Sequence, residues 1–168
     1  MHVFLKPFAL LSLLFSGAIF GFFYAWVCST MWGLDQADPN TAIAAMQAMN
    51  ASVRNAVFAP AFFGTPFVLL LTAFIARRAG QVRAAAFFGA GGLLYLAGGL
   101  ILTMAVNVPM NEALALIQTP LAPAEATAVW GEYSPRWQVW NITRTIASGL
   151  TLLLTGLAMM SIRPRHSS

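Results

Sequence analysis

The sequence has 168 residues, of which 59% are hydrophobic and only 8% are charged. Soluble domains carry about 25% charged residues, so this deficit, with a mean hydropathy of +0.73, excludes an ordinary soluble protein and predicts a membrane protein. The net charge of +4 does not indicate nucleic-acid binding, because the basic residues stand singly or in pairs beside apolar runs. With one cysteine, Cys28, the chain cannot form an intrachain disulfide or a cysteine-based metal or c-type haem site.

The first predicted membrane span covers residues 8–33. No charge occurs from Pro7 to Leu34, a run long enough to cross a bilayer. A signal peptide is the competing interpretation, because Lys6 precedes the apolar core, but the run is too long for a typical signal-peptide core. Small residues recur at every fourth position, a pattern typical of close helix–helix contacts. We expect this face to pack inside the bundle; the alternative is a homo-oligomer interface through Gly17, Gly21 and Ala25.

Residues 35–55 form the first predicted outer connection. Asp38-Pro39 is a typical helix start, with an N-cap side chain followed by proline in the first turn. An apolar stripe and a polar stripe then alternate at helical spacing, as in a helix that lies on a membrane surface or over the mouth of a pocket. The apolar stripe consists of Ala42, Met46, Met49 and Val53, and the polar one of Gln47, Asn50 and Arg54.

Three further spans are predicted at residues 56–76, 84–106 and 137–162. A short basic loop separates the second span from the third. The second outer connection covers residues 107–136, where Pro109 is expected to end or kink the third span. Residues 124–133 are expected to form a separate short helix, and Ser134-Pro135 a new N-cap that opens the fourth span. The predicted fold is therefore an all-α integral membrane four-helix bundle, a single domain over residues 1–168, with short interfacial helices on the outer side.

The fourth span carries a polar ridge that the fold must bury. On a helical wheel these residues share one face at spacings of three and four. Lipid offers their hydrogen-bonding groups no partner, so we expect them to face the bundle. Arginine costs the most to bury, roughly 2.5–3.5 kcal/mol at a helix centre. The polar ridge consists of Trp137, Asn141, Arg144, Ser148, Thr151 and Thr155, and the opposite face carries Val139, Ile146, Leu150 and Leu153.

The distribution of charge predicts the orientation. Basic residues follow the positive-inside rule if the termini and the central loop face the cytoplasm. We therefore expect a multi-pass protein of the bacterial inner membrane, with both termini cytoplasmic. The basic residues on that side are Lys6, Arg77, Arg78, Arg83, Arg163 and Arg165, and the acids on the other are Asp35, Asp38, Glu112, Glu125 and Glu132.

Metal and cofactor sites have little support in the sequence. His2 and His166 stand at opposite ends of the chain and Cys28 is alone, so no ligands occur at metal-binding spacing. A haem held by a terminal histidine is the remaining alternative. The motifs of serine hydrolases, P-loop proteins and Rossmann enzymes are missing from the sequence. We expect no metal and no cofactor.

The candidate site is a group of polar and aromatic residues near the outer interface. Each has a structural alternative: the tryptophans as an aromatic belt, the asparagines as helix caps, and Arg144 as the partner of Glu112 or Glu132 in an ion pair. Together, amides, an indole and a guanidinium that face one cavity would bind an anion or an enolate. The group consists of Asn107, Asn111, Trp130, Trp137, Trp140, Asn141 and Arg144.

Two of these motifs resemble a known family. Asn107-Val108-Pro109-Met110-Asn111, followed some thirty residues later by Trp137-x-x-Trp140-Asn141-x-x-Arg144, is similar to the anthrone-oxygenase-like family of small four-helix membrane proteins. The resemblance implies oxidation of an anthrone to an anthraquinone by molecular oxygen, without metal or flavin. It would give catalytic roles to Arg144, Asn107, Asn111 and Asn141 as oxyanion donors and to Glu112 or Glu132 as base, and substrate stacking to Trp130, Trp137 and Trp140.

Two non-enzymatic functions remain open at this point. The protein can bind or carry a hydrophobic aromatic small molecule in the same pocket without chemistry. It can also be an accessory subunit whose small-residue faces dock a larger membrane complex.

Overall fold

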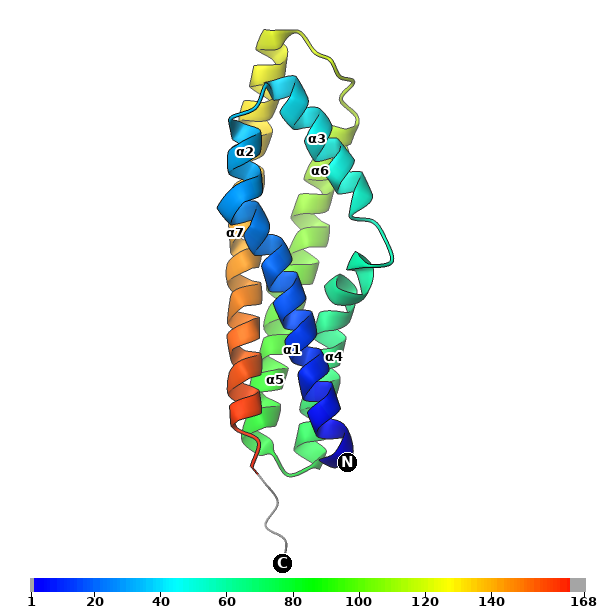
Figure 1. Ribbon diagram of the computed structural model, residues 1–168, viewed down its shortest axis with the longest axis vertical. Helices are drawn as coiled ribbons and strands as arrows, with labels where there is room; N and C mark the ends of the chain where they lie inside the picture. The colour runs from blue at the N-terminus through cyan, green and yellow to red at the C-terminus, as the bar shows by residue number, and fades with distance from the viewer. Residues whose placement is uncertain (1, 164–168) are drawn as a thin grey trace, which may run out of the picture.

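The computed structural model describes residues 2–163, and this part of the chain folds into a bundle of long helices (Figure 1). Four helical rods are long and apolar enough to cross a membrane, at Val3–Asp35, Phe58–Arg78, Val82–Ala115 and Pro123–Met160. The predicted all-α fold with four spans is thereby confirmed. The first and third rods contain short π-helical segments, labelled η. The elements are α1 (His2–Ala25), η1 (Trp26–Thr30), α2 (Met31–Asp35), α3 (Pro39–Ser52), α4 (Phe58–Arg78), α5 (Val82–Tyr95), η2 (Leu96–Ile101), η3 (Thr103–Asn107), α6 (Val108–Ala115) and α7 (Pro123–Met160).

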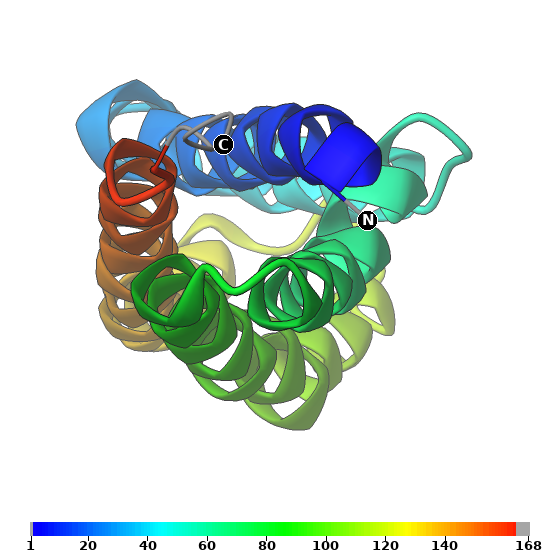
Figure 2. The same ribbon diagram turned by 90° about the horizontal axis from the view of Figure 1, so that it is seen from below.

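The four rods form a ring in which each helix packs against two neighbours. Seen along the bundle, the order around the ring is α1, α4, α5 and α7 (Figure 2). At the lower end Leu5, Leu69 and Phe88 are fully or almost fully buried in a small apolar core. Higher up, hydroxyl pairs join the helices: Ser12 and Thr72 are 2.9 Å apart. Because lipid cannot solvate them, these hydroxyls satisfy one another inside the ring.

The helices differ in length, and this difference creates an upper cap. At 1.5 Å per residue, the 21 residues of α4 span about 32 Å and the 38 residues of α7 about 57 Å. A hydrocarbon core is about 30 Å thick, so α7 continues well beyond the end of α4. Elements α2, α3 and α6 pack around this upper part of α7, at the end of the molecule opposite the termini (Figure 1). Their contact residues form a second apolar core, which includes Met31, Ile43, Met46, Leu114 and Trp130.

The upper cap corrects two predicted boundaries. The expected break at Ser134-Pro135 is wrong, because α7 runs without interruption from Pro123 to Met160 with Pro135 inside it. Proline removes one backbone hydrogen bond from a helix, but burial of Trp130 and Tyr133 under the cap holds the helix together across it. The third rod likewise continues past Pro109, which occupies the first turn of α6 and therefore costs little.

Helix α3 forms as expected, with one difference in its environment. The Asp38 carboxylate caps it by accepting a hydrogen bond from the Thr41 N–H at 3.2 Å. Ala42, Ile43 and Met46 on its apolar face are completely buried against the protein. The apolar stripe therefore faces the bundle rather than a membrane surface, and α3 covers the upper end of the bundle.

The small-residue face of α1 does not pack inside the bundle. Gly21 and Ala25 are exposed, and a Cβ atom added at Gly17 or Gly21 would meet no atom within 4 Å. The expectation of bundle packing is wrong because the opposite face of α1, with Ile19 and Phe23, supplies the larger apolar side chains that fill the ring. Whether the small-residue face binds a second copy of the chain stays a prediction.

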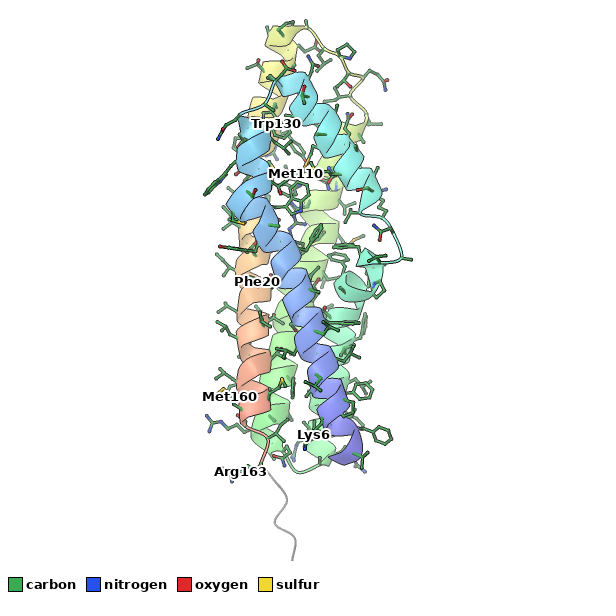
Figure 3. All side chains as sticks on the ribbon, viewed as in Figure 1. Lys6, Phe20, Met110, Trp130, Met160 and Arg163 are labelled. Carbon is green, nitrogen blue, oxygen red and sulfur yellow. The ribbon has the colours of Figure 1, made fainter. Side chains whose placement is uncertain are left out.

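Both ends of the described chain lie at the same end of the bundle. Gln81, in the α4–α5 connection, donates to the carbonyl of Arg163 at 3.0 Å and accepts from its N–H at the same distance. Figure 3 shows Lys6, Met160 and Arg163 at this end, and Trp130 towards the other. The two ends of the described chain and the α4–α5 connection thus share one side, as an even number of spans requires.

Candidate functional site

The polar ridge of α7 faces the bundle, as its spacing predicts. Its six members are between 0% and 5% exposed, whereas Val139, Ile146, Leu150 and Leu153 on the opposite face are 46% to 65% exposed. In its lower half the ridge is structural. The Thr151 hydroxyl donates to the carbonyl of Gly91 on α5 at 3.2 Å, and Thr155 lies 3.4 Å from Ser16 on α1. The upper half, from Arg144 to Trp137, has a different environment.

Arg144 is a buried cation held by neutral groups. One terminal nitrogen donates to Asn141 Oδ1 at 2.8 Å and the other to Thr103 Oγ1 at 3.3 Å. The guanidinium carbon lies 4.6 Å from the ring centre of Phe23 and 5.1 Å from that of Trp137, which favours a cation–π interaction with both rings. The Nε–H group is buried and has no hydrogen-bond partner. Much of the hydrogen-bonding capacity of this guanidinium is therefore unused.

The expected ion pair between Arg144 and a glutamate is wrong. Glu112 instead pairs with Arg54 at 3.4 Å, and Glu132 with Arg136 at 3.7 Å. All four of these side chains are more than half exposed, so both pairs lie at the surface of the cap rather than in its interior. Within residues 2–163 the charge of Arg144 has no carboxylate partner.

A cavity of about 580 Å³ opens beside Arg144. Its walls come from α1 and η1, the end of α3, the start of α4, the η3–α6 segment, and α7. Aromatic rings dominate these walls: the ring centres of Phe22 and Phe58 are 4.7 Å apart, those of Phe58 and Phe62 5.2 Å apart, and those of Trp26 and Trp137 5.1 Å apart. Large apolar surfaces with a few placed polar groups are typical of small-molecule sites.

Two π-helical segments supply residues to this cavity. Trp26 begins η1, and Thr103 begins η3. Thr103 Oγ1 donates to the Gly99 carbonyl at 2.6 Å, which leaves its lone pairs free to accept from Arg144. A π-helical turn contains one extra residue and is frequent at functional sites. Here the irregular turns bring an indole and a hydroxyl to the wall of the cavity.

Asn111 is the centre of a second polar group in the cavity wall. Its Oδ1 accepts from the Tyr133 hydroxyl and from the Trp137 indole N–H, both at 2.9 Å. Its Nδ2 donates to Asn50 Oδ1 at 3.0 Å. This network connects α6, α7 and α3, so the cap and the cavity wall are built from the same contacts.

Asn107 and Asn141 lie behind the wall rather than in it. Asn141 is 1% exposed; its Oδ1 holds Arg144 and its Nδ2 donates to the Phe23 carbonyl at 3.2 Å. Asn107 is completely buried at the end of η3, and neither atom of its amide has a hydrogen-bond partner. Asn107 occurs four residues after Thr103 and four before Asn111, both of which line the cavity.

Two of the three predicted tryptophans lie away from the cavity. Trp140 is 37% exposed and does not line it. Trp130 donates to Asp35 at 3.0 Å, and Ser134 and Gln138 donate to the same carboxylate at 2.6 and 2.9 Å, so this indole joins α2 to α7. Of the residues predicted from the sequence, the structure brings Arg144, Trp137, Asn111 and Glu112 to the cavity lining.

Sequence reasoning missed most of the aromatic wall and several polar residues of the cavity. The aromatic residues of the first two spans gave no signal, because phenylalanine and tryptophan are equally expected where a helix faces lipid or a core. Asn50 carried a signal, because it belongs to the polar stripe of α3, of which Asn50 and Arg54 line the cavity. The missed lining residues include Phe22, Phe23, Trp26, Asn50, Phe58, Phe62 and Thr103.

No metal-binding group occurs in the described part of the chain. Within it no three His, Cys, Asp or Glu side chains lie together as ligands of one ion. Cys28 is exposed on η1. His166 lies outside the described residues.

Comparison with known families gives a match over more than half of the chain. A family model described as anthrone oxygenase matches residues 51–154. This range begins at the end of α3 and includes the cavity residues Phe58, Thr103, Asn111, Trp137 and Arg144. Comparisons with curated proteins and with solved structures give no match.

Proposed function

The chain belongs to the anthrone oxygenase family, and from this premise we propose that it oxidises an anthrone-like aromatic molecule with molecular oxygen in the cavity beside Arg144. The family membership supports an oxygenase-like role, to which we add a substrate class and a site. It requires no metal or organic cofactor. It also supposes that the cavity faces outward from a bacterial inner membrane, with the basic loop on the cytoplasmic side.

The observation that carries the proposal is the unpaired guanidinium of Arg144 beside a cavity with aromatic walls. Burying a charge without a counter-ion is costly, so a buried ionisable residue inside a membrane bundle indicates a functional site. A flat aromatic ketone fits the walls by stacking, and loss of a proton converts it to an enolate. The guanidinium is already desolvated and oriented, so it stabilises that oxyanion without reorganisation.

The chemistry then needs a base and oxygen. Among the described residues that line the cavity, Glu112 is the one acid. We assign it the role of taking the methylene proton next to the aromatic rings, which leaves an electron-rich enolate. The enolate transfers two electrons in total to dioxygen and forms a C–O bond at the former methylene carbon, which gives a peroxide anion. This anion takes back the proton from Glu112 and becomes a hydroperoxide. Loss of water from the hydroperoxide gives the quinone, so one dioxygen is consumed and one water is released per ketone formed.

The first test measures oxygen uptake and quinone absorbance in membranes that contain the protein and an added anthrone. We expect Arg144→Gln to lower the rate by about 10- to 1,000-fold, the range for loss of one oxyanion donor. The matched control is Arg136→Gln, an arginine on the same helix that is 68% exposed and does not line the cavity. Equal rates for wild type and Arg144→Gln, at equal expression and above the uncatalysed reaction with air, would refute catalysis at this site.

The second test concerns the base. Glu112→Gln should reduce the rate by about 100-fold or more, because a positioned general base contributes roughly 10²–10⁴-fold. Glu132→Gln is the control: Glu132 pairs with Arg136 and does not line this cavity. If both variants keep the wild-type rate, the proton is removed by solvent or by another group.

A binding or carrier function without chemistry is the second candidate. It is favoured by the place of Glu112, whose carboxylate is 60% exposed and paired with Arg54 rather than held against Arg144. Saturable binding of an anthrone without oxygen uptake would support this function. A stoichiometric partner that copurifies with the protein would instead support an accessory subunit.

A further inference from the structure

The amide of Asn111 has its orientation determined by its neighbours. The indole N–H of Trp137 and the hydroxyl of Tyr133 both donate to the same side of this amide. An indole nitrogen can only donate, so the atom that it contacts must be the oxygen. The ambiguity between amide oxygen and nitrogen is thereby resolved at Asn111.

The orientation of Asn111 determines that of Asn50. Because the Asn111 oxygen faces α7, its NH₂ group points to α3 and donates to Asn50 Oδ1 at 3.0 Å. The oxygen of Asn50 is then held by Asn111, and its NH₂ group is directed elsewhere. This nitrogen is buried and has no hydrogen-bond partner, although Asn50 lines the cavity. A buried amide donor without a partner is costly, because it loses its hydrogen bonds to water and gains none in the protein.

The cavity thus contains two separate sets of unused donors. One is the guanidinium of Arg144, from α7, and the other is the amide of Asn50, from α3. They are separated by a chain of contacts: Arg144 lies against the Trp137 ring, Trp137 donates to Asn111, and Asn111 donates to Asn50. The Thr103 oxygen already accepts from Arg144. The polar interior therefore offers mainly donors, which suits a ligand with acceptor oxygens.

We propose that Asn50 is a specificity-determining residue, which donates a hydrogen bond to a second oxygen of the ligand when Arg144 holds the first. The ligand class is a flat, fused-ring aromatic molecule with acceptor oxygens at two separate positions, such as a quinone or a hydroxylated aromatic ketone. This inference shares with the proposed function the assumption that the cavity is the ligand site, but it does not depend on turnover.

The test compares the affinities of three ring systems of similar shape. The protein is placed in lipid nanodiscs, and binding is followed by quenching of tryptophan fluorescence, with empty nanodiscs as the correction for partition into lipid. Anthracene has no oxygen, anthrone has one, and anthraquinone has two at opposite positions. Each is titrated into wild type, Asn50→Asp and Asn50→Ala.

The expected result is a loss that depends on the number of oxygens. Asn50→Asp keeps the size of the side chain and the acceptor for Asn111, but replaces the NH₂ group, which has no hydrogen-bond partner, by a carboxylate oxygen. It should weaken anthraquinone binding by more than about 10-fold, because two acceptors then face each other. Asn50→Ala, which removes the donor without adding charge, should weaken it by about 3- to 10-fold. Both variants should bind anthracene within about twofold of wild type, and Asn50→Ala should also bind anthrone within this range.

The matched control is Asn40→Asp, on the same helix but outside the cavity. Asn40 Nδ2 donates to the Leu121 carbonyl at 3.1 Å, so this variant makes the same change from amide to carboxylate on α3, away from the cavity. It should leave all three affinities within about twofold of wild type. If Asn50→Asp does not fold, Asn50→Ala carries the comparison.

The outcomes separate this inference from the proposed function. An equal loss for anthracene and anthraquinone, or no loss for anthraquinone, would overturn the role of Asn50 whether or not the protein is an enzyme. If the loss of affinity depends on the number of oxygen atoms in the ligand but no turnover occurs, the role of Asn50 is supported and the oxygenase function is contradicted. Absence of binding of both anthrone and anthraquinone to wild type would contradict both.

Discussion

At the scale of single residues, Arg144 combines two properties that usually exclude each other. Its side chain is 5% exposed, yet it has no carboxylate partner among residues 2–163. Neutral acceptors on Asn141 and Thr103 and the faces of two aromatic rings compensate part of the desolvation. Removing one partner of a buried ion pair leaves the other charge without a counter-ion. Removing Arg144 leaves no such charge, because no carboxylate among residues 2–163 pairs with it.

We therefore predict that Arg144→Met changes stability little while it abolishes the activity proposed above. The buried charge disappears, and the unbranched methionine fills much of the space, so the free energy of unfolding should change by less than about 2 kcal/mol. Thermal or denaturant unfolding in detergent measures this change. A drop above about 3 kcal/mol, typical of a broken buried ion pair, would mean that the arginine has an anionic partner. Arg136→Met, at an exposed position, is the control.

At the scale of elements, the contact between the third rod and α7 depends on glycine. A Cβ atom at Gly98 in η2 would lie 2.7 Å from the Cβ of Ala147 on α7, closer than two carbon atoms can pack. Gly91, one level below, would place a Cβ 3.5 Å from the Thr151 carbonyl. These close approaches allow the Thr151 hydroxyl to reach the Gly91 carbonyl and keep the two helices together immediately below Arg144.

This geometry predicts opposite effects for two glycine-to-alanine substitutions. Gly98→Ala forces the helices apart and should lower the free energy of unfolding by about 1–3 kcal/mol, the usual cost of overpacking. Gly156→Ala, on α7 with no atom within 4 Å of the added Cβ, should raise it by up to about 1 kcal/mol, because alanine is the better helix former. Unfolding of both variants in the same detergent measures the difference. Equal effects would contradict the close contact between Gly98 in η2 and Ala147 in α7.

At the scale of the whole molecule, length and charge place the bundle in the membrane. The four rods share a section comparable to the bilayer core, and the cap of α2, α3 and α6 continues beyond the end of α4. Arg77 and Arg78 in the last turn of α4, and Arg83 in the first turn of α5, flank the α4–α5 connection. This connection lies at the end that also holds Lys6 and Arg163 (Figure 3). The positive-inside rule predicts that this end faces the cytoplasm.

Cysteine labelling in intact cells tests this orientation. In a Cys28→Ser background, Ala124→Cys in the cap should react with a membrane-impermeant maleimide, because Ala124 is exposed and the cap is predicted to lie on the outer side. Val82→Cys, 56% exposed beside the basic connection, should react only after permeabilisation. Labelling of both positions from one side, or the reverse pattern, would contradict the assigned topology.

The sequence by itself determined the membrane class, the four spans and the face that α7 buries. These properties follow from local rules: lipid excludes charge, a span needs about 20 apolar residues, and polar side chains at three- and four-residue spacing share one side of a helix. The same local rules predicted that Arg144 and Trp137 face the interior, and the Asp38-Pro39 pair predicted the start of α3.

Only the tertiary structure decided which side chains meet. The glutamates pair with Arg54 and Arg136 at the surface rather than with Arg144, and Pro135 remains inside α7 because the cap buries the helix on both sides of it. Trp130 binds Asp35, Trp140 faces outward, and Asn50 reaches the cavity wall from a helix more than 60 residues before its partner Asn111. Such partners come from different helices, so their contacts depend on relative rotation and height, which helical periodicity within one segment does not encode.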